Sequence, residues 1–343
     1  MERLLFFAPM SVSYKAVTET FGESFASLNA LIDKECQAST SPLLKELLSH
    51  TFKVRGKMLR PLFTFSLAQT LGLDSKSENV LNVAAGLEIL HTASLVHDDI
   101  IDNGEIRRGQ ATVNKKWGIG EATLLGDWLL AKSFELMTRT RNFELIHAMT
   151  LLTSELTEGQ FLENESNQNQ EYPEEVYLQM IDLKTSSMFR WAGGFVSYLK
   201  AGASDQKLTE QMKHLGTSFG AAFQVVDDLI DLLQKEEEAQ KTTQLDLLNG
   251  TKTLPVLRAL KLERETGKST LSLCLNSRDF GSLNMGLEAY LREMGVLESC
   301  FNLANNYIQD CKNILSEFPD SVGRSTLLSL CELTLSQVRS RIH

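Results

Sequence analysis

Two aspartate clusters with the same spacing are the residues of this chain that could most readily do chemistry. Their members are Asp98, Asp99 and Asp102 in the first cluster, and Asp227, Asp228 and Asp231 in the second. Residues i and i+4 share one face of a helix, so the outer aspartates of each cluster point the same way. Like charges at this spacing repel each other, and both clusters follow apolar stretches where unpaired charge is costly. A cation is therefore expected between them, and carboxylate oxygens suit Mg²⁺ that carries a substrate phosphate.

Basic residues near the first cluster fit the same kind of ligand. Arg107 and Arg108 follow it in a glycine-containing segment, and Gly56, Lys57 and Arg60 form a second compact cationic group. The guanidinium group of arginine matches phosphate oxygens with two parallel hydrogen bonds. A single acidic cluster or basic motif is more often a solvated surface. Two of each together indicate one cavity that binds a diphosphate through divalent cations.

The composition is that of a soluble globular protein and excludes some classes of partner. The chain carries 34 Lys and Arg against 44 Asp and Glu, a formal net charge of −10, and no basic patch stands out. Nucleic acid is therefore not expected as a partner. Five scattered cysteines without a CxxC pair favour a reduced, cytoplasmic location. No transmembrane segment is expected, because the longest apolar run, 80–96, is interrupted by Asn82, Glu88 and His91 and falls short of the roughly 18 residues that a spanning helix needs.

The elements that must position the candidate residues are predicted to be helices. Alternating runs rich in Val, Ile and Thr, bounded by Asn-Gly or Asp-Gly turns, are absent from the sequence. Ser41-Pro42 is typical of a helix start. Residues 86–102 and 215–231 are both apolar helical segments that end in DDxID, which places each aspartate cluster at the end of a helix. Polar stretches are expected to form loops at 103–112, 163–171 and 235–253. We expect an all-α fold of about ten or more helices in a single domain over residues 1–343.

Four motifs together resemble the trans-isoprenyl diphosphate synthases, also called polyprenyl synthetases. They are GKMLRP at 56–61, HTASLVHDDIID at 91–102, RRG at 107–109 and FQVVDDLID at 223–231. The likeness covers about residues 40–341 and leaves 1–20 as a variable N-terminal segment. It implies an α-helical bundle around a deep central cavity, usually a homodimer. It also implies a prenyltransferase that joins an allylic diphosphate to isopentenyl diphosphate.

The resemblance further implies roles for individual side chains. About three Mg²⁺ ions per site would be held by Asp98, Asp102, Asp227 and Asp231, while Asp99 and Asp228 orient waters and ligands around them. The allylic diphosphate would be contacted by Arg107, Lys184, Thr185, Gln224 and Lys241. Isopentenyl diphosphate would be bound by Gly56, Lys57, Arg60, His91 and Arg108. The residues expected to stabilise the departing diphosphate, and so to be catalytic, are Asp98, Asp102, Arg107, Lys184 and Asp227.

The expected product is a long all-trans polyprenyl diphosphate, close to octaprenyl in length. In the family, the fifth and fourth residues before the first aspartate motif lie near the floor of the tunnel for the growing chain. Here they are Ala93 and Ser94, whose small side chains imply an open tunnel. The alternative is that a deeper residue closes the tunnel, with Phe134, Met137 and Met149 as candidates. The product would then be shorter, as in farnesyl or geranylgeranyl diphosphate synthases.

The segment after the second cluster departs from the family pattern. Lys241 and Asp246 keep their spacing, but two usual glycines are replaced, and Thr251 stands where a lysine is common, with Lys252 one position later. This departure puts the Lys252 contact in doubt. It also keeps open the alternative that the chain is one subunit of a heteromeric synthase. A class I terpene cyclase is the third alternative, although such enzymes usually lack the GKxxRP and RRG motifs that this chain has.

Overall fold

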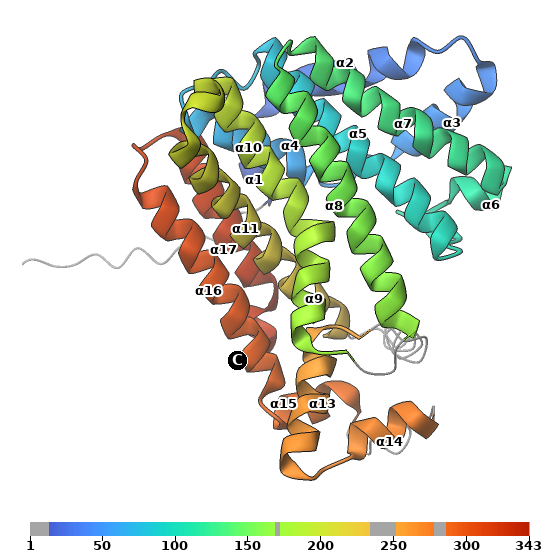
Figure 1. The fold of residues 1–343 in the computed structure, drawn as a ribbon, viewed down its shortest axis with the longest axis vertical. Helices are drawn as coiled ribbons and strands as arrows, with labels where there is room; N and C mark the ends of the chain where they lie inside the picture. The colour runs from blue at the N-terminus through green and yellow to red at the C-terminus, as the bar shows by residue number, and fades with distance from the viewer. Residues whose placement is uncertain (1–13, 169–171, 234–251, 278–285, 343) are drawn as a thin grey trace, which may run out of the picture. The chain divides into compact units, whose positions relative to one another are not determined.

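The computed structural model describes residues 14–168, 172–233, 252–277 and 286–342 (Figure 1). Within these residues the regular structure is helical except for one antiparallel hairpin, β1 (Ile106–Arg107) and β2 (Gln110–Ala111). The predicted all-α fold of ten or more helices is therefore confirmed. The chain divides into two compact units, each with its own internal contacts. The single domain expected over residues 1–343 stays a prediction.

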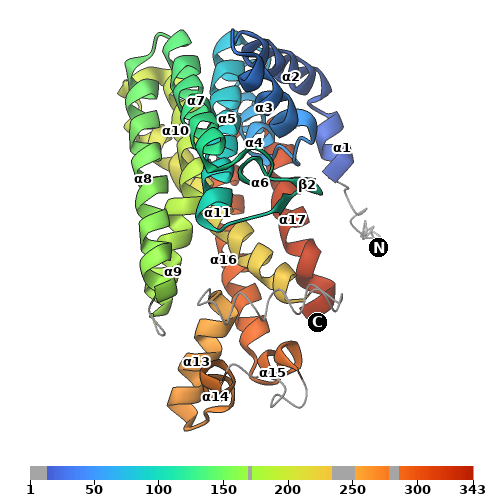
Figure 2. The same ribbon diagram turned by 90° about the vertical axis from the view of Figure 1, so that its right-hand side faces the viewer.

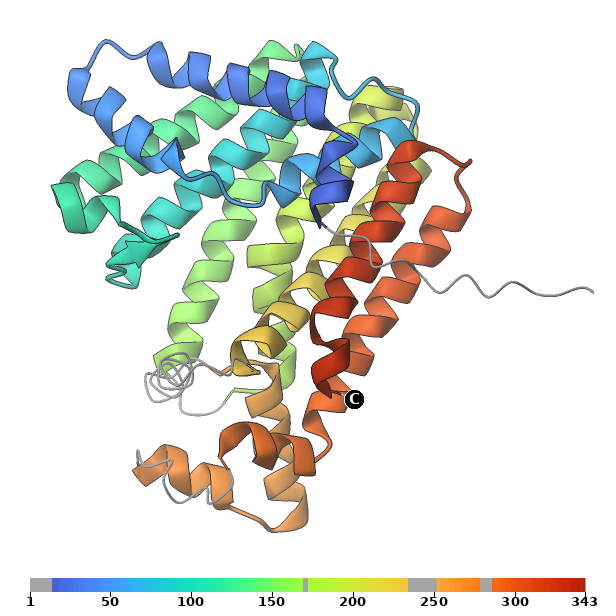
Figure 3. The same cartoon turned by 180° about the vertical axis from the view of Figure 1, so that it is seen from behind.

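Unit 1 comprises Met1–Leu151, Trp191–Lys213 and Phe318–Leu327. Its helices in chain order are α1 (Tyr14–Glu19), α2 (Gly22–Gln37), α3 (Pro42–Lys53), α4 (Leu59–Thr70), α5 (Glu78–Ile101), α6 (Val113–Trp117), α7 (Ile119–Arg139) and the 3-10 helix η2 (Gly202–Ser204). The longest of them, α5, packs against α2, α4, α6 and α7. In Figure 3, α1, α2 and α3 are the blue helices at the start of the described chain. The first aspartate cluster is thus carried by the central helix of this unit.

Local sequence explains how two of these helices are placed. The hydroxyl of Ser41 accepts a hydrogen bond from the amide of Leu44 at 3.3 Å and proline follows in the first turn, so the predicted start of α3 is confirmed. Close packing of α5 on α7 depends on two glycines. A Cβ at Gly86 would lie 2.7 Å from Cε of Met137, and one at Gly126 would lie 2.1 Å from Nε2 of His97. The side chain of His97 therefore packs on α7.

Helix α5 is also the one described helix that is long and apolar enough to cross a membrane. The sequence predicts no transmembrane segment. By length and composition alone, helix α5 departs from that prediction. In the structure, 67% of the apolar window is buried inside the protein, as in a core helix. The buried residues include the polar Asn82 and Glu88. This burial assigns α5 to the core of unit 1.

Unit 2 comprises Leu152–Arg190, His214–Glu317 and Leu328–His343. Its own elements are α9 (Glu174–Ile181), the π-helix η1 (Asp182–Ser186), α13 (Leu254–Thr266), α14 (Thr270–Ser277), α15 (Leu287–Glu293) and α16 (Val296–Ser316). Helix α13 packs against α9, α14, α15 and α16 (Figure 1). Four helices contribute residues to both units: α8 (Phe143–Gln168), α10 (Ser187–Ala201), α11 (Gln206–Leu232) and α17 (Val322–Ile342).

Backbone contact between α11 and the η1–α10 segment positions the second aspartate cluster. A Cβ at Gly216 would lie 2.1 Å from the carbonyl oxygen of Phe189, and one at Gly220 would lie 2.5 Å from Cα of Ser186. Larger residues at these two positions would push the segments apart. The glycines therefore hold the aspartate-bearing helix close to η1. Short π-helical segments such as η1 occur frequently at functional sites.

The predicted loops had mixed outcomes. The predicted start of the loop at residue 163 is wrong, because helix α8 continues to Gln168. Its polar composition was typical of a loop, yet glutamate and glutamine are good helix formers on an exposed helix. The stretch 103–112 does contain the connection between α5 and α6, folded as the hairpin. Most of the third stretch, 235–253, lies outside the described residues.

Candidate active site

The first aspartate cluster lies at the C-terminal end of α5 in unit 1, and its middle member differs from its outer pair. Asp99 is buried, whereas Asp98 is half-buried and Asp102 is exposed. Arg107 donates from Nε to both carboxylate oxygens of Asp99 at 2.9 Å, and its Nη2 lies 2.8 Å from Oδ1. Arg107, expected to contact the allylic diphosphate, is therefore ion-paired to Asp99. The accessible carboxylates are those of the outer pair.

The hairpin that follows α5 is held against the end of this helix (Figure 2). The side-chain amide of Asn114 donates to the backbone carbonyl of Asp99 at 3.0 Å and to that of Gly104 at 3.1 Å. The hydroxyl of Thr112 donates to the Gly104 carbonyl at 2.7 Å. These bonds fix the turn that carries the two arginines of the RRG motif.

A cationic group forms around Arg60 and His91 in the same unit. The guanidinium of Arg108 lies against Gly56, where a Cβ would be 2.5 Å from its Nη2, and its Nη1 donates to the carbonyl of Val54 at 3.3 Å. Burial lowers the pKa of Arg60 to about 10, which leaves it charged at pH 7. Burial, followed by the charges of Arg60 and Arg108, lowers the pKa of His91 well below its ordinary value. His91 is therefore neutral at pH 7.

Lys57 lies in the loop between α3 and α4, next to this group. The hydroxyl of Tyr14 in α1 donates to the carbonyl of Lys57, and Arg55 in the same loop donates to Asn29 and Asp33 of α2. The loop is thus tied to two helices. The five residues expected to bind isopentenyl diphosphate lie in one region of unit 1, and their role stays a prediction.

The two residues expected to set chain length face different ways. Gly86 and His97 both contact α7, and Ala93 lies seven residues after the first and four before the second, so it shares their face. Ala93 is accordingly buried. Ser94 lies four residues before Asp98, on the face of the outer aspartates, and is half-buried. Among the three alternatives for closing the tunnel, Met137 and Met149 are fully buried and Phe134 is half-buried.

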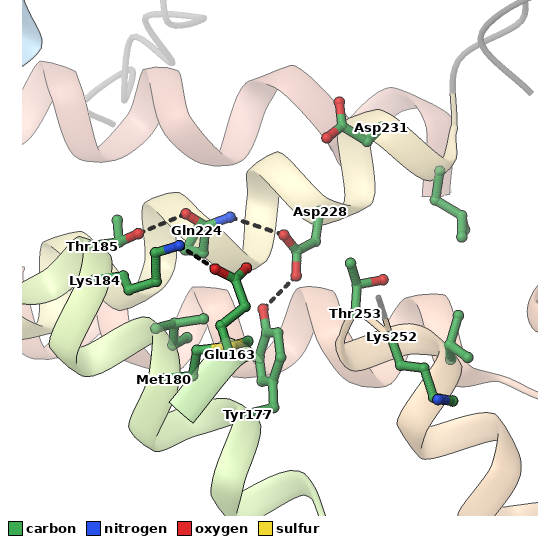
Figure 4. A pocket seen from close by; sticks show the side chains of 13 residues that line it. Glu163, Tyr177, Met180, Lys184, Thr185, Gln224, Asp228, Asp231, Lys252 and Thr253 are labelled. Atoms are coloured by element: carbon green, nitrogen blue, oxygen red, sulfur yellow. Dashed lines mark hydrogen bonds and ion pairs between the residues drawn. The ribbon is translucent and has the colours of Figure 1, made fainter. Parts of the chain in front are cut away.

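The second aspartate cluster lies near the end of α11 in unit 2 and repeats the arrangement of the first. Asp228 is buried, while Asp227 and Asp231 are exposed. The hydroxyl of Tyr177 donates to Oδ2 of Asp228, and the amide of Gln224 donates to Oδ1 at 2.9 Å (Figure 4). Burial raises the pKa of Asp228 to about 7, although both of these hydrogen bonds lower it.

A cavity of about 340 Å³ opens beside this cluster within unit 2. Its polar lining residues are Glu163, Tyr177, Lys184, Thr185, Gln224, Asp228, Asp231, Lys252 and Thr253 (Figure 4). The hydroxyl of Thr185 donates to Oε1 of Gln224 at 2.8 Å, so both ends of that amide are engaged. The ammonium of Lys184 donates to Oε1 of Gln160 at 2.6 Å and to the carboxylate of Glu163. The lining therefore combines carboxylates and ammonium groups around a space of small-molecule size.

The family is decided by comparison with known proteins. The family model described as Polyprenyl synthetase matches residues 41–290. The chain belongs to the polyprenyl synthetase family. It is a prenyltransferase that makes all-trans polyprenyl diphosphates, as the resemblance of its motifs implied.

Relatives of this polyprenyl synthetase match along nearly their whole length. The geranylgeranyl diphosphate synthase of Sulfolobus acidocaldarius is 34% identical over 92% of this chain and 97% of its own length. The nonaprenyl diphosphate synthase of Mycobacterium tuberculosis is 32% identical over 91% and 92%. The solved decaprenyl diphosphate synthase of Rhodobacter capsulatus superimposes with a TM-score of 0.84 at 29% identity, covering 95% of this chain and all of that one. The polyprenyl synthase of Caulobacter crescentus, solved with calcium and isoprenyl diphosphate, gives 0.79 at 28%, covering 95% and 98%.

The donor set of this polyprenyl synthetase fits a metal that is shared with a ligand. Among the described side chains, no three His, Cys, Asp or Glu groups are arranged to hold a metal by themselves. Each cluster instead offers an outer pair of carboxylates, Asp98 with Asp102 and Asp227 with Asp231. Magnesium commonly binds through one or two carboxylates, waters and substrate phosphates rather than in a cage made only of protein. The pairs therefore fit that mode of binding.

Sequence reasoning about the synthetase missed several residues that line the cavity, including the polar Tyr177 and Glu163, and left the contact of Lys252 unresolved. Tyr177 lies seven residues before Lys184, a helical repeat that could have flagged it. Glu163 was assigned to a loop, although it lies three residues after Gln160 on α8. Lys252, whose contact was in doubt, is buried and lines the cavity. Lys241, expected to contact the allylic diphosphate, lies outside the described residues.

Proposed function

We propose that this prenyltransferase depends on Mg²⁺ and elongates an allylic diphosphate with isopentenyl diphosphate to a long all-trans product, octaprenyl-like in length. The observation that carries the proposal is the arrangement found in both clusters. In each, a buried middle aspartate is fixed by donors, and the outer pair is more exposed to solvent than the middle residue. Two accidental acidic surfaces would not be expected to share this arrangement.

In each cluster the outer aspartates would hold Mg²⁺ that a diphosphate shares, and Asp99 and Asp228 would hold the local geometry. Bound Mg²⁺ supplies positive charge that stabilises the diphosphate as it leaves. Lys184 adds an ammonium on the cavity wall. Arg107 can bind Asp99 and a phosphate oxygen at once, because a guanidinium has five N–H donors. These groups stabilise the leaving diphosphate while the allylic cation forms.

The cationic group of unit 1 binds isopentenyl diphosphate. Arg60 stays charged, and Arg108 lies against the backbone of Gly56, so guanidinium forks are available to a second diphosphate. A neutral His91 can donate one hydrogen bond without adding charge. The double bond of this substrate attacks the allylic cation, and the released diphosphate is the expected acceptor of the proton that is then lost.

A long product is proposed because of the small side chain at position 94, which lies one helical turn before Asp98. Ser94 is small and lies one helical turn before this aspartate, so a growing chain that passed along this face would meet no large side chain at position 94. The relatives themselves range from geranylgeranyl to decaprenyl diphosphate synthases. A shorter product, as in farnesyl or geranylgeranyl diphosphate synthases, is the alternative.

A homodimer is proposed because the motifs resemble a family that is usually homodimeric, and a second copy of this chain is the proposed partner. Leu124 on α7 is 70% exposed and Phe143 at the start of α8 is 74% exposed, so unit 1 carries large apolar side chains on its surface. A cytoplasmic location is also proposed, because all five cysteines are free thiols, as a reduced compartment would keep them.

Incubation of the purified protein alone with farnesyl diphosphate, isopentenyl diphosphate and Mg²⁺, followed by mass analysis, tests the function. An elongated diphosphate supports the proposal and gives its length. A hydrocarbon would instead identify a cyclase. Turnover that requires a second polypeptide would identify a heteromeric subunit, and chelation of Mg²⁺ without loss of activity would contradict the metal dependence.

A further inference from the structure

The ammonium of Lys184 is already engaged inside the cavity of unit 2. It donates to Oε1 of Gln160 at 2.6 Å and forms an ion pair with the carboxylate of Glu163. The Glu163 and Lys184 side chains are 25% and 26% exposed, so the pair is partly shielded from water. Figure 4 shows the carboxylate of Glu163 directed at this ammonium. A lysine expected to attract a diphosphate thus has a carboxylate as its counter-ion.

The charges around the cavity oppose a diphosphate that arrives without metal. Three carboxyl groups line the space, those of Glu163, Asp228 and Asp231, against the ammonium groups of Lys184 and Lys252. Glu163 cancels the charge of Lys184 at close range. Like charges in a partly buried site repel more strongly than in water, since the effective dielectric constant is lower. A bare diphosphate would therefore meet three carboxyl groups, a Lys184 whose charge is neutralised by Glu163, and the single ammonium of Lys252.

We propose that Glu163 is a specificity-determining residue that makes the cavity accept diphosphate carrying divalent cations and reject diphosphate without them. The inference rests on the proposed function. A phosphate oxygen replaces the Glu163 carboxylate as the partner of Lys184, and Gln160 keeps its hydrogen bond to the ammonium. The displaced carboxylate remains close to the ligand, where its negative charge is tolerated only if cations on the diphosphate compensate for it.

The test compares the binding of inorganic pyrophosphate with and without Mg²⁺ by titration calorimetry. Glu163→Gln keeps the shape and one acceptor for Lys184 but removes the charge. Without metal we expect this variant to bind pyrophosphate about tenfold more tightly than the natural protein, which is the order of one charge interaction near a protein surface. With saturating Mg²⁺ the difference should fall to about twofold or less, because the ions compensate the carboxylate.

Glu155→Gln is a matched control on the same helix. Glu155 lies eight residues before Glu163, is 26% exposed and pairs with Arg190 at 2.8 Å. This control should leave the metal-free affinity unchanged. Glu163→Asp keeps the charge and should also behave like the natural protein, which guards against a general effect of altering this position. Circular dichroism and melting curves confirm that the variants fold.

The outcomes separate the inference from the function on which it rests. Equal metal-free affinities in Glu163→Gln and the natural protein would overturn the inference. A gain of the same size with and without Mg²⁺ would overturn it as well. If the natural protein bound no pyrophosphate even with Mg²⁺, the proposed function would fall, and this inference with it.

Discussion

Tyr177 and Asp228 are joined by a hydrogen bond from the phenolic hydroxyl to Oδ2 of the buried carboxylate. Gln224 donates to the other carboxylate oxygen, so the side chain is held at both ends. In unit 1, Arg107 holds the two oxygens of Asp99. Each cluster therefore consists of one fixed inner carboxylate and an accessible outer pair. The inner aspartates are best understood as supports, because their oxygens are already committed to protein donors.

Removing the Tyr177 hydroxyl tests this support. In Tyr177→Phe the carboxylate of Asp228 loses a donor that lowers its pKa, so its pKa rises from about 7 to a higher value. Less of it is ionised at pH 7, and the pH at which metal binding reaches half its maximum should move upward. We expect affinity for Mn²⁺, measured by electron paramagnetic resonance, to fall about tenfold at pH 7, as when supporting groups around a metal are lost.

Tyr290→Phe provides the control for this change. The hydroxyl of Tyr290 donates to Oε1 of Glu263 at 2.6 Å, so the variant also deletes a tyrosine–carboxylate hydrogen bond in unit 2, but away from the lining of the cavity. It should lower the melting temperature without changing Mn²⁺ affinity. An equal loss of Mn²⁺ affinity in both variants would show that Tyr177 acts only through stability.

An outer aspartate should be far more important for turnover than for folding. Asp227 is exposed on α11, so Asp227→Asn removes a charge without disturbing the core. We expect kcat/KM to fall by about 10³, in the range seen when one preorganised group that stabilises transition-state charge is lost. Asp310→Asn on α16 is the control, because Asp310 is also exposed and should tolerate the change. Steady-state assays at several Mg²⁺ concentrations would detect the effect. Retention of full activity in Asp227→Asn would rule out the metal-binding role.

Spacing rules predicted the helices well, and the pairing of the outer aspartates for metal binding stays a prediction. Asp227 and Asp231 are four residues apart on one helix, α11, and both their spacing and the helix itself can be predicted from the neighbouring sequence. The extent of α8 was missed, because loop and exposed helix both favour polar residues, and the stretch from Glu163 to Gln168 has no apolar face to distinguish them. Composition therefore gives the fold class more reliably than the ends of its elements.

The partners of the inner aspartates were less predictable. Tyr177 precedes Asp228 by 51 positions, and their contact depends on how α9 packs near α11. Resemblance to the family named Gln224 and Thr185 as diphosphate contacts, whereas in the structure these side chains bond each other. No local pattern encodes such a pair, because it forms only when the glycines of α11 bring the segments together.

Product length should respond to a large side chain at position 94. Ser94 shares the face of Asp98, so Ser94→Phe places a ring where the growing chain is expected to pass. We expect the main product to be several isoprene units shorter, with less change in the rate of the first condensation. Thin-layer analysis of the dephosphorylated products would show the shift. An unchanged product distribution would contradict the proposed path of the chain.

Ala93→Phe is the informative comparison for that experiment. Ala93 is buried on the face that contacts α7, so a ring there overpacks the interface between two helices. Overpacking typically costs about 1–3 kcal/mol. We therefore expect a lower melting temperature for Ala93→Phe, measured by differential scanning calorimetry, whereas Ser94→Phe should melt close to the natural protein. The reverse result would exchange the assignments of the two faces.

Acid stability should depend on Glu35, which joins α2 to α7. Arg139 and Lys132 bind its carboxylate, with Arg139 Nη1 at 2.6 Å and Lys132 Nζ at 3.2 Å. The hydrogen bond from Arg139 is the largest cause that holds the pKa of Glu35 below its ordinary value of 4.5, against the effect of burial. A group whose pKa is lowered by folding stabilises the folded state above its unfolded pKa and loses that contribution as the pH falls through its folded pKa.

Glu35→Gln should therefore destabilise the protein at pH 7 and matter less in acid. The loss at pH 7 should be about 3 kcal/mol, because two cations are left facing a neutral group in a partly buried site. Urea unfolding from pH 7 to pH 3 should show the difference between the variant and the natural protein shrinking below pH 4.5. Glu23→Gln breaks an exposed pair with Lys76 and serves as the control, with no measurable change expected. A difference that stayed constant across this pH range would mean that Glu35 contributes through packing, since packing does not titrate.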